Sequence, residues 1–249
     1  MRGLRSKTHE LRRIGLARAL SKQGLCSRSV ATAWILAGRV RLNGKVVRNP
    51  EAPTTTESRI EVDEQLIDSA LPVYLMLNKP RGLVTTAHDE RDRGTVYECL
   101  NGSALPWVAP VGRLDQASEG LLLFTNDSEW AAGLLDPAHH IAKTYHVQVE
   151  GIPSAAVCAQ WVAGIRVRDG ELLSAAAVSV LRHGARNAWL EVSLTEGRNR
   201  QLRRLCEAVE HPVLRLIRVA IGPLQLGALT KGAWRYLEAT EVAGLRGSP

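Results

Sequence analysis

The sequence predicts an α+β protein in which a small N-terminal unit precedes a larger mixed, mostly antiparallel sheet with helices packed on it. The first observation is a helix–helix–hairpin pattern within the first 62 residues. The second is a series of β-type runs after residue 73, interrupted by helix-type segments. The third is a length of 249 residues with 45% hydrophobic residues, which suffices for a sizeable core.

Two helices are expected at the start of the small unit, which we predict at residues 14–70. A short helix spans residues 14–24, and Gly24 suits its left-handed end. Ser27 is a favourable N-cap for a second helix that runs to Ala37, because apolar residues recur at helical spacing along it.

A hairpin and a linker complete the small unit. Asn43-Gly44 lies between two alternating segments and is the strongest short hairpin signal. Residues 60–62 are expected to close the unit, and residues 65–72 are interpreted as a linker. Residues 1–13 are basic and poor in apolar groups, which is typical of a flexible arm.

Strand-type and helix-type segments alternate through the larger unit, predicted at residues 71–249. Asp127 suits the N-cap position of its first helix. Alternation after Lys143 places Tyr145, Val147 and Val149 on one face of a strand. The expected strands are 73–77, 121–124, 143–151, 188–194 and 213–221, and the expected helices are 128–135 and 154–163. Residues 232–237 are expected to end the fold.

The segment Gly112-Arg113-Leu114-Asp115 leads into an apolar run with the length of a buried strand. Asp115 therefore lies in an irregular segment beside a rigid core element, where a carboxylate can be held in a cleft. Arg113 and Asp115 point to the same side of an extended chain. An ion pair between them at the strand entrance is the alternative, and residue types alone leave both interpretations open.

A second arginine-rich segment runs from Glu196 to Cys206. Asn199 is expected to cap a helix whose first turn carries several arginines, although the helix macrodipole favours acidic groups there. Such a local conflict is typical of a functional site. The alternative is a solvated basic face with an ordinary ion pair between Arg203 and Glu207.

Charge and cysteine usage restrict the class of protein. The net charge of +7 favours a polyanionic partner. The four cysteines are scattered, without metal-site spacing or a disulfide framework, which indicates a reducing, cytoplasmic location. No run is long enough to cross a membrane, and no metal site is expected.

The N-terminal pattern resembles a known RNA-binding module. The segments Gly24-Leu25-Cys26-Ser27-Arg28, Ala37-Gly38-Arg39-Val40 and Leu42-Asn43-Gly44-Lys45 are similar to the alpha-L module of a ribosomal small-subunit protein and several RNA-modifying enzymes. The resemblance implies that the exposed basic residues contact RNA, namely Arg28, Arg39, Arg41 and Lys45. Trp34 is expected in the core rather than as a base-stacking platform.

The segment Leu77-Asn78-Lys79-Pro80-Arg81-Gly82 is similar to the first catalytic-domain segment of the RsuA-type pseudouridine synthases, which modify ribosomal RNA. Four further motifs that follow it resemble motifs of the same family and occur in the family's order. The motifs are Gly112-Arg113-Leu114-Asp115, Ser118-Glu119-Gly120-Leu121-Leu122, Lys143-Thr144-Tyr145, and Glu196-Gly197-Arg198-Asn199-Arg200-Gln201-Leu202-Arg203-Arg204. The resemblance implies the pseudouridine synthase fold and the isomerisation of uridine to pseudouridine.

The resemblance also implies roles for individual side chains. Asp115 is the essential carboxylate, Tyr145 stacks on the target base and Arg203 pairs with Asp115. Arg113 holds the flipped nucleotide or its phosphate, and Leu202 walls the base pocket. Asp115 either attacks the ribose or takes a proton in a glycal-type route, and the sequence does not choose between them. Further RNA contacts are expected from Lys79, Arg198 and Arg200.

The expected partner is ribosomal RNA, with the large subunit favoured, either naked or in an assembling ribosome. A monomer without a cofactor is expected. A non-catalytic RNA-binding or ribosome-assembly protein is the alternative, and the combination of Asp115, Tyr145 and Arg203 disfavours it. A DNA-binding regulator is disfavoured because no recognition helix stands out.

Overall fold

The computed structural model describes residues 13–55, 57–68 and 70–246. These form two compact units: the smaller contains the chain up to Pro72 together with Leu105–Val108, and the larger contains Val73–Ala104 and the chain from Ala109 onward. The predicted basic arm, apart from Arg13, lies outside the described residues.

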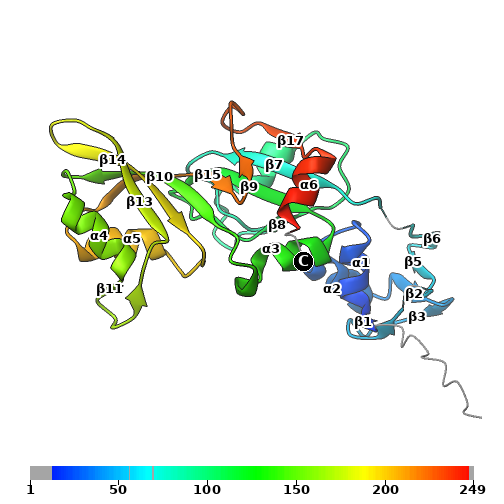
Figure 1. Cartoon of the computed structure of the whole chain (residues 1–249). Coiled ribbons are helices and arrows are strands. Elements are labelled where there is room, and N and C mark those ends of the chain that lie inside the picture. Colours follow the sequence, from blue (N-terminus) through cyan, green and yellow to red (C-terminus); the bar gives the residue numbers. More distant parts are fainter. Residues whose placement is uncertain (1–12, 56, 69, 247–249) are drawn as a thin grey trace, which may run out of the picture. The chain divides into compact units, whose positions relative to one another are not determined.

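The smaller unit consists of two helices and short antiparallel strands (Figure 1). Its core includes Leu16, Leu20 and Ile35, which are fully buried. One sheet has the strand order β3-β2-β5-β6, and β1 pairs with β4. The elements are β1 Ile14–Gly15, α1 Leu16–Lys22, α2 Arg28–Leu36, β2 Val40–Leu42, β3 Lys45–Val46, β4 Pro53–Thr54, β5 Ile60–Val62 and β6 Gln65–Leu66.

Local signals in this unit are confirmed with two corrections. Ile14 and Gly15, predicted at the start of the first helix, form β1 and pair with β4, so α1 begins at Leu16. The Ser27 hydroxyl accepts a hydrogen bond from the Val30 amide at 3.2 Å, as an N-cap does. Asn43 and Gly44 have φ values of 50° and 80°, which suit the tight turn between β2 and β3. The linker interpretation of residues 65–72 is wrong at its start, because Gln65 and Leu66 form β6 and pair with β5.

The larger unit is built on a mixed sheet of nine strands with the main order β13-β14-β10-β15-β9-β7-β17; β8 pairs with β9, and β16 with β15. Among the strands of this sheet in the described residues, only β9 and β15 pair in parallel, so the predicted mostly antiparallel sheet is confirmed. The strands are β7 Tyr74–Lys79, β8 Ala109–Val111, β9 Glu119–Thr125, β10 Lys143–Glu150, β13 Ala177–His183, β14 Asn187–Leu194, β15 Val213–Ile221, β16 Leu224–Gln225 and β17 Trp234–Tyr236. A separate pair is formed by β11 Ile165–Arg166 and β12 Leu172–Leu173.

Two apolar clusters join helices to this sheet (Figure 1). Trp161 of α4 and Leu202 of α5 pack with the buried side chains of β10 and β14. Trp130 of α3 and Leu245 of α6 pack with β7 and β9. The helices are α3 Ser128–Leu135, α4 Ala155–Ala163, α5 Gln201–Ala208 and α6 Ala239–Leu245, with 3₁₀ turns at Val96–Leu100 and Pro137–His139.

Strand β9 anchors the segment that carries Asp115. All seven of its residues are buried. Gly120 pairs with Arg218 of β15, and a Cβ atom on Gly120 would lie 2.2 Å from the Arg218 carbonyl oxygen. Gly120 also has a φ of 102°, which glycine tolerates best. The glycine therefore permits the close parallel pairing that fixes where the preceding loop begins.

Candidate active site

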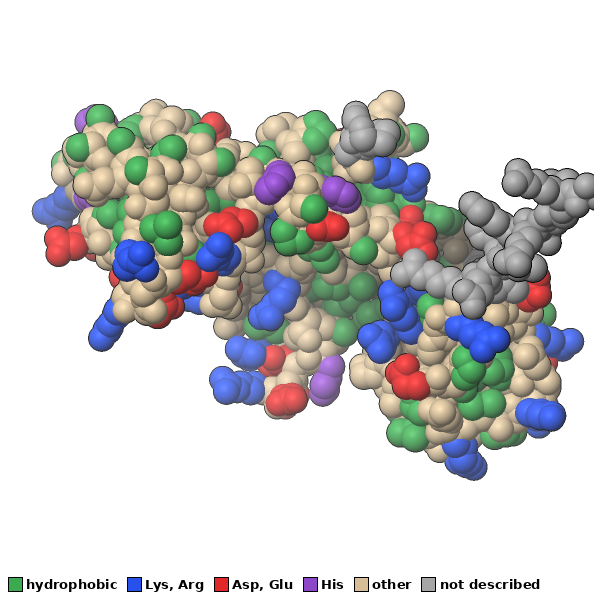
Figure 2. All heavy atoms as spheres, turned by 60° about the horizontal axis from the view of Figure 1, so that its bottom comes forward, with side chains coloured by type: hydrophobic (Ala, Val, Ile, Leu, Met, Phe, Trp, Pro, Cys, Tyr) green, Lys and Arg blue, Asp and Glu red, His purple; other side chains and the backbone are tan. Residues whose placement is uncertain are grey.

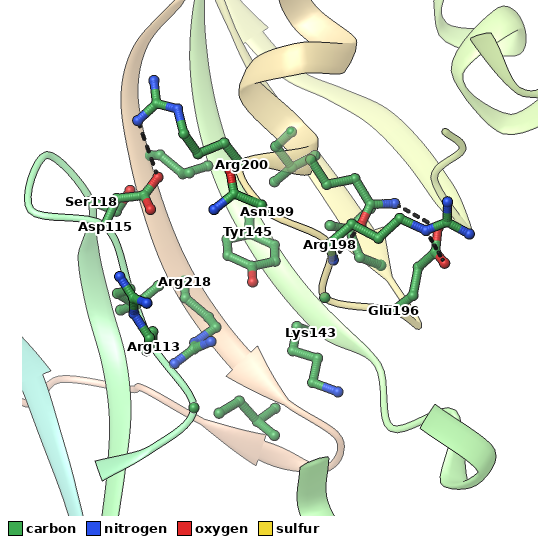
Figure 3. Close-up of a pocket in the computed structure, with 18 of the residues that line it drawn as sticks. Arg113, Asp115, Ser118, Lys143, Tyr145, Glu196, Arg198, Asn199, Arg200 and Arg218 are labelled. Carbon is green, nitrogen blue, oxygen red and sulfur yellow. Dashed lines mark hydrogen bonds and ion pairs between the residues drawn. The ribbon is translucent and has the colours of Figure 1, made fainter. Parts of the chain in front are cut away.

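A cavity of about 680 Å³ opens in the larger unit (Figure 3). The loop between β8 and β9, strands β10 and β15 and the N-terminal end of α5 supply its walls. Five residues predicted from the catalytic motifs line it together: Arg113, Asp115, Tyr145, Leu202 and Arg203. The fold thus brings side chains from distant segments to one cavity.

The Asp115 carboxylate lies partly exposed in this cavity between two guanidinium groups. Its Oδ2 atom is 3.6 Å from Nη1 of Arg200 and 3.7 Å from Nε of Arg203. Its side chain is 34% exposed, so substrate can reach it. The alternative ion pair with Arg113 is wrong: in the described chain, the ion-pair partners of Asp115 are Arg200 and Arg203.

Arg203 connects α5 to the Asp115 loop. Its side chain is 15% exposed, and its Nη2 donates a hydrogen bond to the Ala117 carbonyl at 3.3 Å. Burial lowers the pKa of Arg203, and the nearby Arg200 charge lowers it further. The alternative ion pair with Glu207 is absent from the described ion pairs, because the guanidinium turns toward Asp115 instead.

The segment before α5 is held by a buried glutamine. The Gln201 side chain accepts a hydrogen bond from the Arg198 amide at 3.2 Å and donates to the Ser174 carbonyl and a Glu196 carboxylate oxygen, each at 2.9 Å. The predicted Asn199 cap is wrong. Arg200 occupies the N-cap position in a left-handed conformation with φ 48° and makes no side-chain cap bond.

Acidic partners compensate part of the arginine cluster. Arg198 forms ion pairs with Glu171 at 2.6 Å and Glu196 at 2.9 Å. Arg204 pairs with Asp169 and with Glu171. Arg198, which is predicted to contact RNA, therefore already has its charge paired within the protein. Arg200, by contrast, is 53% exposed and faces Asp115.

Lys79 is buried rather than exposed to RNA. The prediction that it lies at the lip of a turn as an RNA contact is wrong, because it ends β7 with no exposed surface. Its ammonium group donates hydrogen bonds to the carbonyl oxygens of Pro80 at 3.0 Å and Ser118 at 2.8 Å. Burial lowers the pKa of Lys79 to about 8. Lys79 thus supports the end of the Asp115 loop from within the core rather than reaching RNA.

The aromatic and apolar walls of the cavity come from β10 and α5. Tyr145 is half-buried, packs against the cluster that contains Leu202, and lies at the centre of the cavity in Figure 3. Leu202 itself is 3% exposed. A flat ring beside a charged carboxylate can stack on a planar base while the carboxylate reaches its sugar.

Sequence reasoning missed Arg218 and assigned no role to Lys143. Both line the cavity, from β15 and β10 respectively. A signal for Arg218 was present, because the alternation of β15 puts it in a core-facing position between Leu216 and Ala220, both buried. A charged residue at such a position breaks the strand pattern and indicates a functional constraint.

The smaller unit carries the remaining predicted RNA contacts, and Figure 2 shows Lys and Arg side chains spread over its surface. Lys45 is exposed, and Arg28 lies 4.0 Å from Glu51. Arg41 lies 3.9 Å from Glu64. Arg39 forms a bidentate ion pair with Asp63 and lies over the Trp34 ring, so its charge is more strongly engaged.

Comparisons with known proteins agree with this geometry. Residues 73–208 match the RNA pseudouridylate synthase family and residues 14–60 match the S4 domain. The ribosomal large subunit pseudouridine synthase B of Bacillus subtilis is 36% identical over 93% of this chain and 95% of its own. An uncharacterized RNA pseudouridine synthase of Aquifex aeolicus is 37% identical over 91% of each chain.

A solved pseudouridylate synthase superposes with a TM-score of 0.65 at 28% identity, covering 93% of this chain and 99% of the other. The chain therefore belongs to the RNA pseudouridylate synthase family and is an RNA pseudouridine synthase. The resemblance inferred from the motifs is confirmed. Within residues 13–246, apart from the two undescribed positions, no helix has the length and apolar character to span a membrane.

Proposed function

We propose that this enzyme isomerises a specific uridine to pseudouridine in ribosomal RNA, with Asp115 as the essential group. The observation that best supports this proposal is the partly exposed Asp115 carboxylate. It lies 3.6 Å and 3.7 Å from two guanidinium groups, in a cavity that Tyr145 also lines. The two guanidinium groups fix the position of the carboxylate, which the reaction needs.

The isomerisation moves one bond of the nucleoside. The C1′–N1 bond breaks, the uracil turns, C5 bonds to C1′, and C5 then loses its proton while N1 gains one. Asp115 either attacks C1′ or removes a ribose proton on a glycal-type route. Both routes need the carboxylate held close to the sugar, which the Asp115 loop and Arg203 provide.

The other cavity residues take positioning roles in this proposal. Tyr145 stacks on the flipped base, and Leu202 walls the pocket. Arg203 holds Asp115 in position, and Arg113 holds the flipped nucleotide. The uridine must leave its stack to enter, which costs a few kcal/mol and least in a loop or bulge.

The substrate class rests on a relative and on the charge distribution. The Bacillus subtilis relative is named for the large ribosomal subunit, which favours large-subunit RNA here as well. We propose that residues 14–70 anchor the RNA, or an assembling ribosome, and that residues 71–249 carry out the chemistry. The four unpaired cysteines suit the cytoplasm. A monomer without a cofactor stays our prediction.

Release of the C5 hydrogen tests the assignment of Asp115. Large-subunit ribosomal RNA transcribed with 5-tritiated uridine should release tritium with the unmodified enzyme. The Asp115→Asn variant should lose roughly a thousandfold or more in rate while binding the RNA normally. Glu150→Gln, at the exposed far end of β10, serves as the matched control. Turnover by Asp115→Asn near the control rate would refute the assignment.

A further inference from the structure

Arg218 is a buried cation that the reaction scheme above does not use. It is 6% exposed and occupies a core-facing position of β15. Its Nε donates a hydrogen bond to the Leu121 carbonyl at 2.7 Å. Its Nη2 atom is buried without a hydrogen-bond partner among the described residues. An unpaired buried donor is costly, so the fold alone gives no reason for an arginine here.

A β-bulge directs Arg218 into the cavity. In the pairing of β10 with β15, Tyr145 lies opposite Arg218, whereas Lys143 lies opposite Ile221. An advance of two residues along β10, from Lys143 to Tyr145, thus corresponds to an advance of three residues along β15. The register shift falls between Thr144 and Tyr145. The extra residue re-aims the side chains around it. Arg218 consequently shares the Tyr145 side of the sheet and lines the same cavity (Figure 3).

Two more cations accompany Arg218 at this part of the cavity. Arg113 and Lys143 line the cavity as well, and in Figure 3 Arg218 lies between them. Burial lowers the pKa of Lys143, and the charge of Arg218 lowers it further. None of the three has an ion pair with a carboxylate among the described residues, unlike Arg198, Arg200, Arg203 and Arg204.

We infer that Arg113, Lys143 and Arg218 form a phosphodiester site, which holds a phosphate next to the target uridine. A planar guanidinium with a free Nη2 suits a phosphate oxygen, and three uncompensated cations favour an anion over a neutral uracil edge. Tyr145 and Asp115 line the same cavity as this site. The inference rests on the proposed function, because it assumes that the cavity receives a nucleotide.

Nucleotide binding by the full chain tests the site without turnover. Titrations of uridine and uridine 3′,5′-bisphosphate, followed by ligand NMR, give the ratio of the two affinities. The unmodified enzyme should bind the bisphosphate about tenfold more tightly or better, as expected for a charge-assisted contact. Lys143→Gln should reduce that preference severalfold. Arg182→Gln, which removes an exposed arginine beside Trp189 on the opposite face of the sheet, should leave it unchanged.

Arg218→Met separates a binding role from a structural one. Methionine fills the core-facing position without a charge, so the variant should unfold at the same temperature as the unmodified enzyme or higher. Its preference for the bisphosphate should nevertheless fall to that of Lys143→Gln or below. Arg218→Lys keeps the charge but loses the planar donor pair, and should retain only part of the preference.

The outcomes distinguish this inference from the proposed function. Asp115→Asn should lose tritium release and keep the preference for the bisphosphate. Equal affinity of the unmodified enzyme for both ligands, or no detectable binding of the bisphosphate, would overturn the phosphodiester site while leaving the assignment of Asp115 untouched. The same preference in Lys143→Gln and Arg218→Met as in the unmodified enzyme would also overturn it.

Discussion

The Asp115 side chain owes its position to residues from two distant segments, the start of α5 and the end of β7. Arg203 reaches it from α5, Arg200 from the loop before α5, and Lys79 supports the loop beyond it through Ser118. Local reasoning paired Asp115 with Arg113, since neighbouring residues are all that such reasoning can compare. Only the family resemblance connected Asp115 with Arg203, because no spacing rule predicts which distant strand and helix will meet.

The burial of Lys79 could not be predicted from the residues around it in the sequence. The segment Lys79-Pro80-Arg81-Gly82 has the composition of a surface turn, and lysine is almost never fully buried. The structure nevertheless buries it and offers two carbonyl oxygens to its ammonium group. One acceptor belongs to the adjacent Pro80, whereas the other, Ser118, comes from tertiary contact with the Asp115 loop, which no local pattern indicates.

The buried Lys79 should make stability depend on pH. Its pKa of about 8 in the folded state is below that of an exposed lysine, so the unfolded chain holds more protons above pH 8. This lysine's contribution to the free energy of unfolding therefore rises with pH. From pH 7 to pH 9, the unmodified protein should gain about 1 kcal/mol relative to Lys79→Met in urea unfolding.

The experiment measures the difference in stability between the unmodified protein and Lys79→Met, because other groups also titrate between pH 7 and pH 9. Burial raises the pKa of Cys26 to about 11, which acts in the opposite direction at alkaline pH but is common to both proteins. Parallel stability curves for the two proteins between pH 7 and pH 9 would contradict the assignment of a depressed pKa to Lys79.

At the scale of elements, the buried strands were predictable and the exposed edge strand was not. β9 carries an apolar run, β15 is rich in apolar and β-branched residues, and α3 begins after the predicted Asp127 cap. β13 was missed because most of its side chains are exposed at the edge of the sheet and show no clean alternation. Its pairing with β14 gives it strand geometry, which is a tertiary effect.

Gly120 should be the most sensitive position of the β9–β15 pair. In Gly120→Ala the new Cβ would lie 2.2 Å from the Arg218 carbonyl oxygen at a φ of 102°. We expect a loss of roughly 3 kcal/mol or more in the free energy of unfolding. Gly102→Ala is the matched control, because Gly102 has a φ of 77° with nothing within 4 Å of the new Cβ.

Gly102→Ala should lower the free energy of unfolding by only about 1 kcal/mol, as expected for an alanine with a left-handed φ. Chemical denaturation of both variants measures the difference. Folded Gly120→Ala protein should also lose activity, because separation of β9 from β15 displaces the loop that carries Asp115. Equal stability of the two variants would show that the parallel pair tolerates more separation than the structure indicates.

For the whole molecule, the net charge of +7 and the basic residues of the smaller unit predict salt-dependent RNA binding. Arg28, Arg41 and Lys45 have weak or no acidic partners among the described residues. Changing all three to Gln should reduce the slope of log affinity against log salt by about 2, since each lost phosphate contact removes roughly 0.7 to 0.9.

A matched triple variant controls for net charge. Arg168, Arg182 and Arg186 are exposed in the larger unit and lie outside the cavity. Their replacement by Gln should leave the salt slope of large-subunit RNA binding almost unchanged. Equal slopes for the two triple variants would mean that charge alone, rather than the smaller unit, determines RNA binding.

The order of the motifs predicts an RNA-binding module before a catalytic unit, but no sequence pattern predicts how the cavity is assembled. Composition and periodicity gave the fold class, and the hairpin at Asn43-Gly44 was read correctly. The parallel pairing of β9 with β15 joins segments far apart in the chain, and no local pattern indicates it. The role of Arg218 depends on that pairing and on the bulge opposite Tyr145.

In the proposed function, the enzyme isomerises a uridine of ribosomal RNA, and Asp115 is essential for the reaction. Site-resolved pseudouridine mapping of ribosomal RNA tests it most directly, in cells that lack this gene and carry either the unmodified protein or Asp115→Asn. We expect one pseudouridine to vanish without the gene, to return with the unmodified protein and to stay absent with Asp115→Asn. An unchanged map in the cells without the gene, or restoration by Asp115→Asn, would contradict the account.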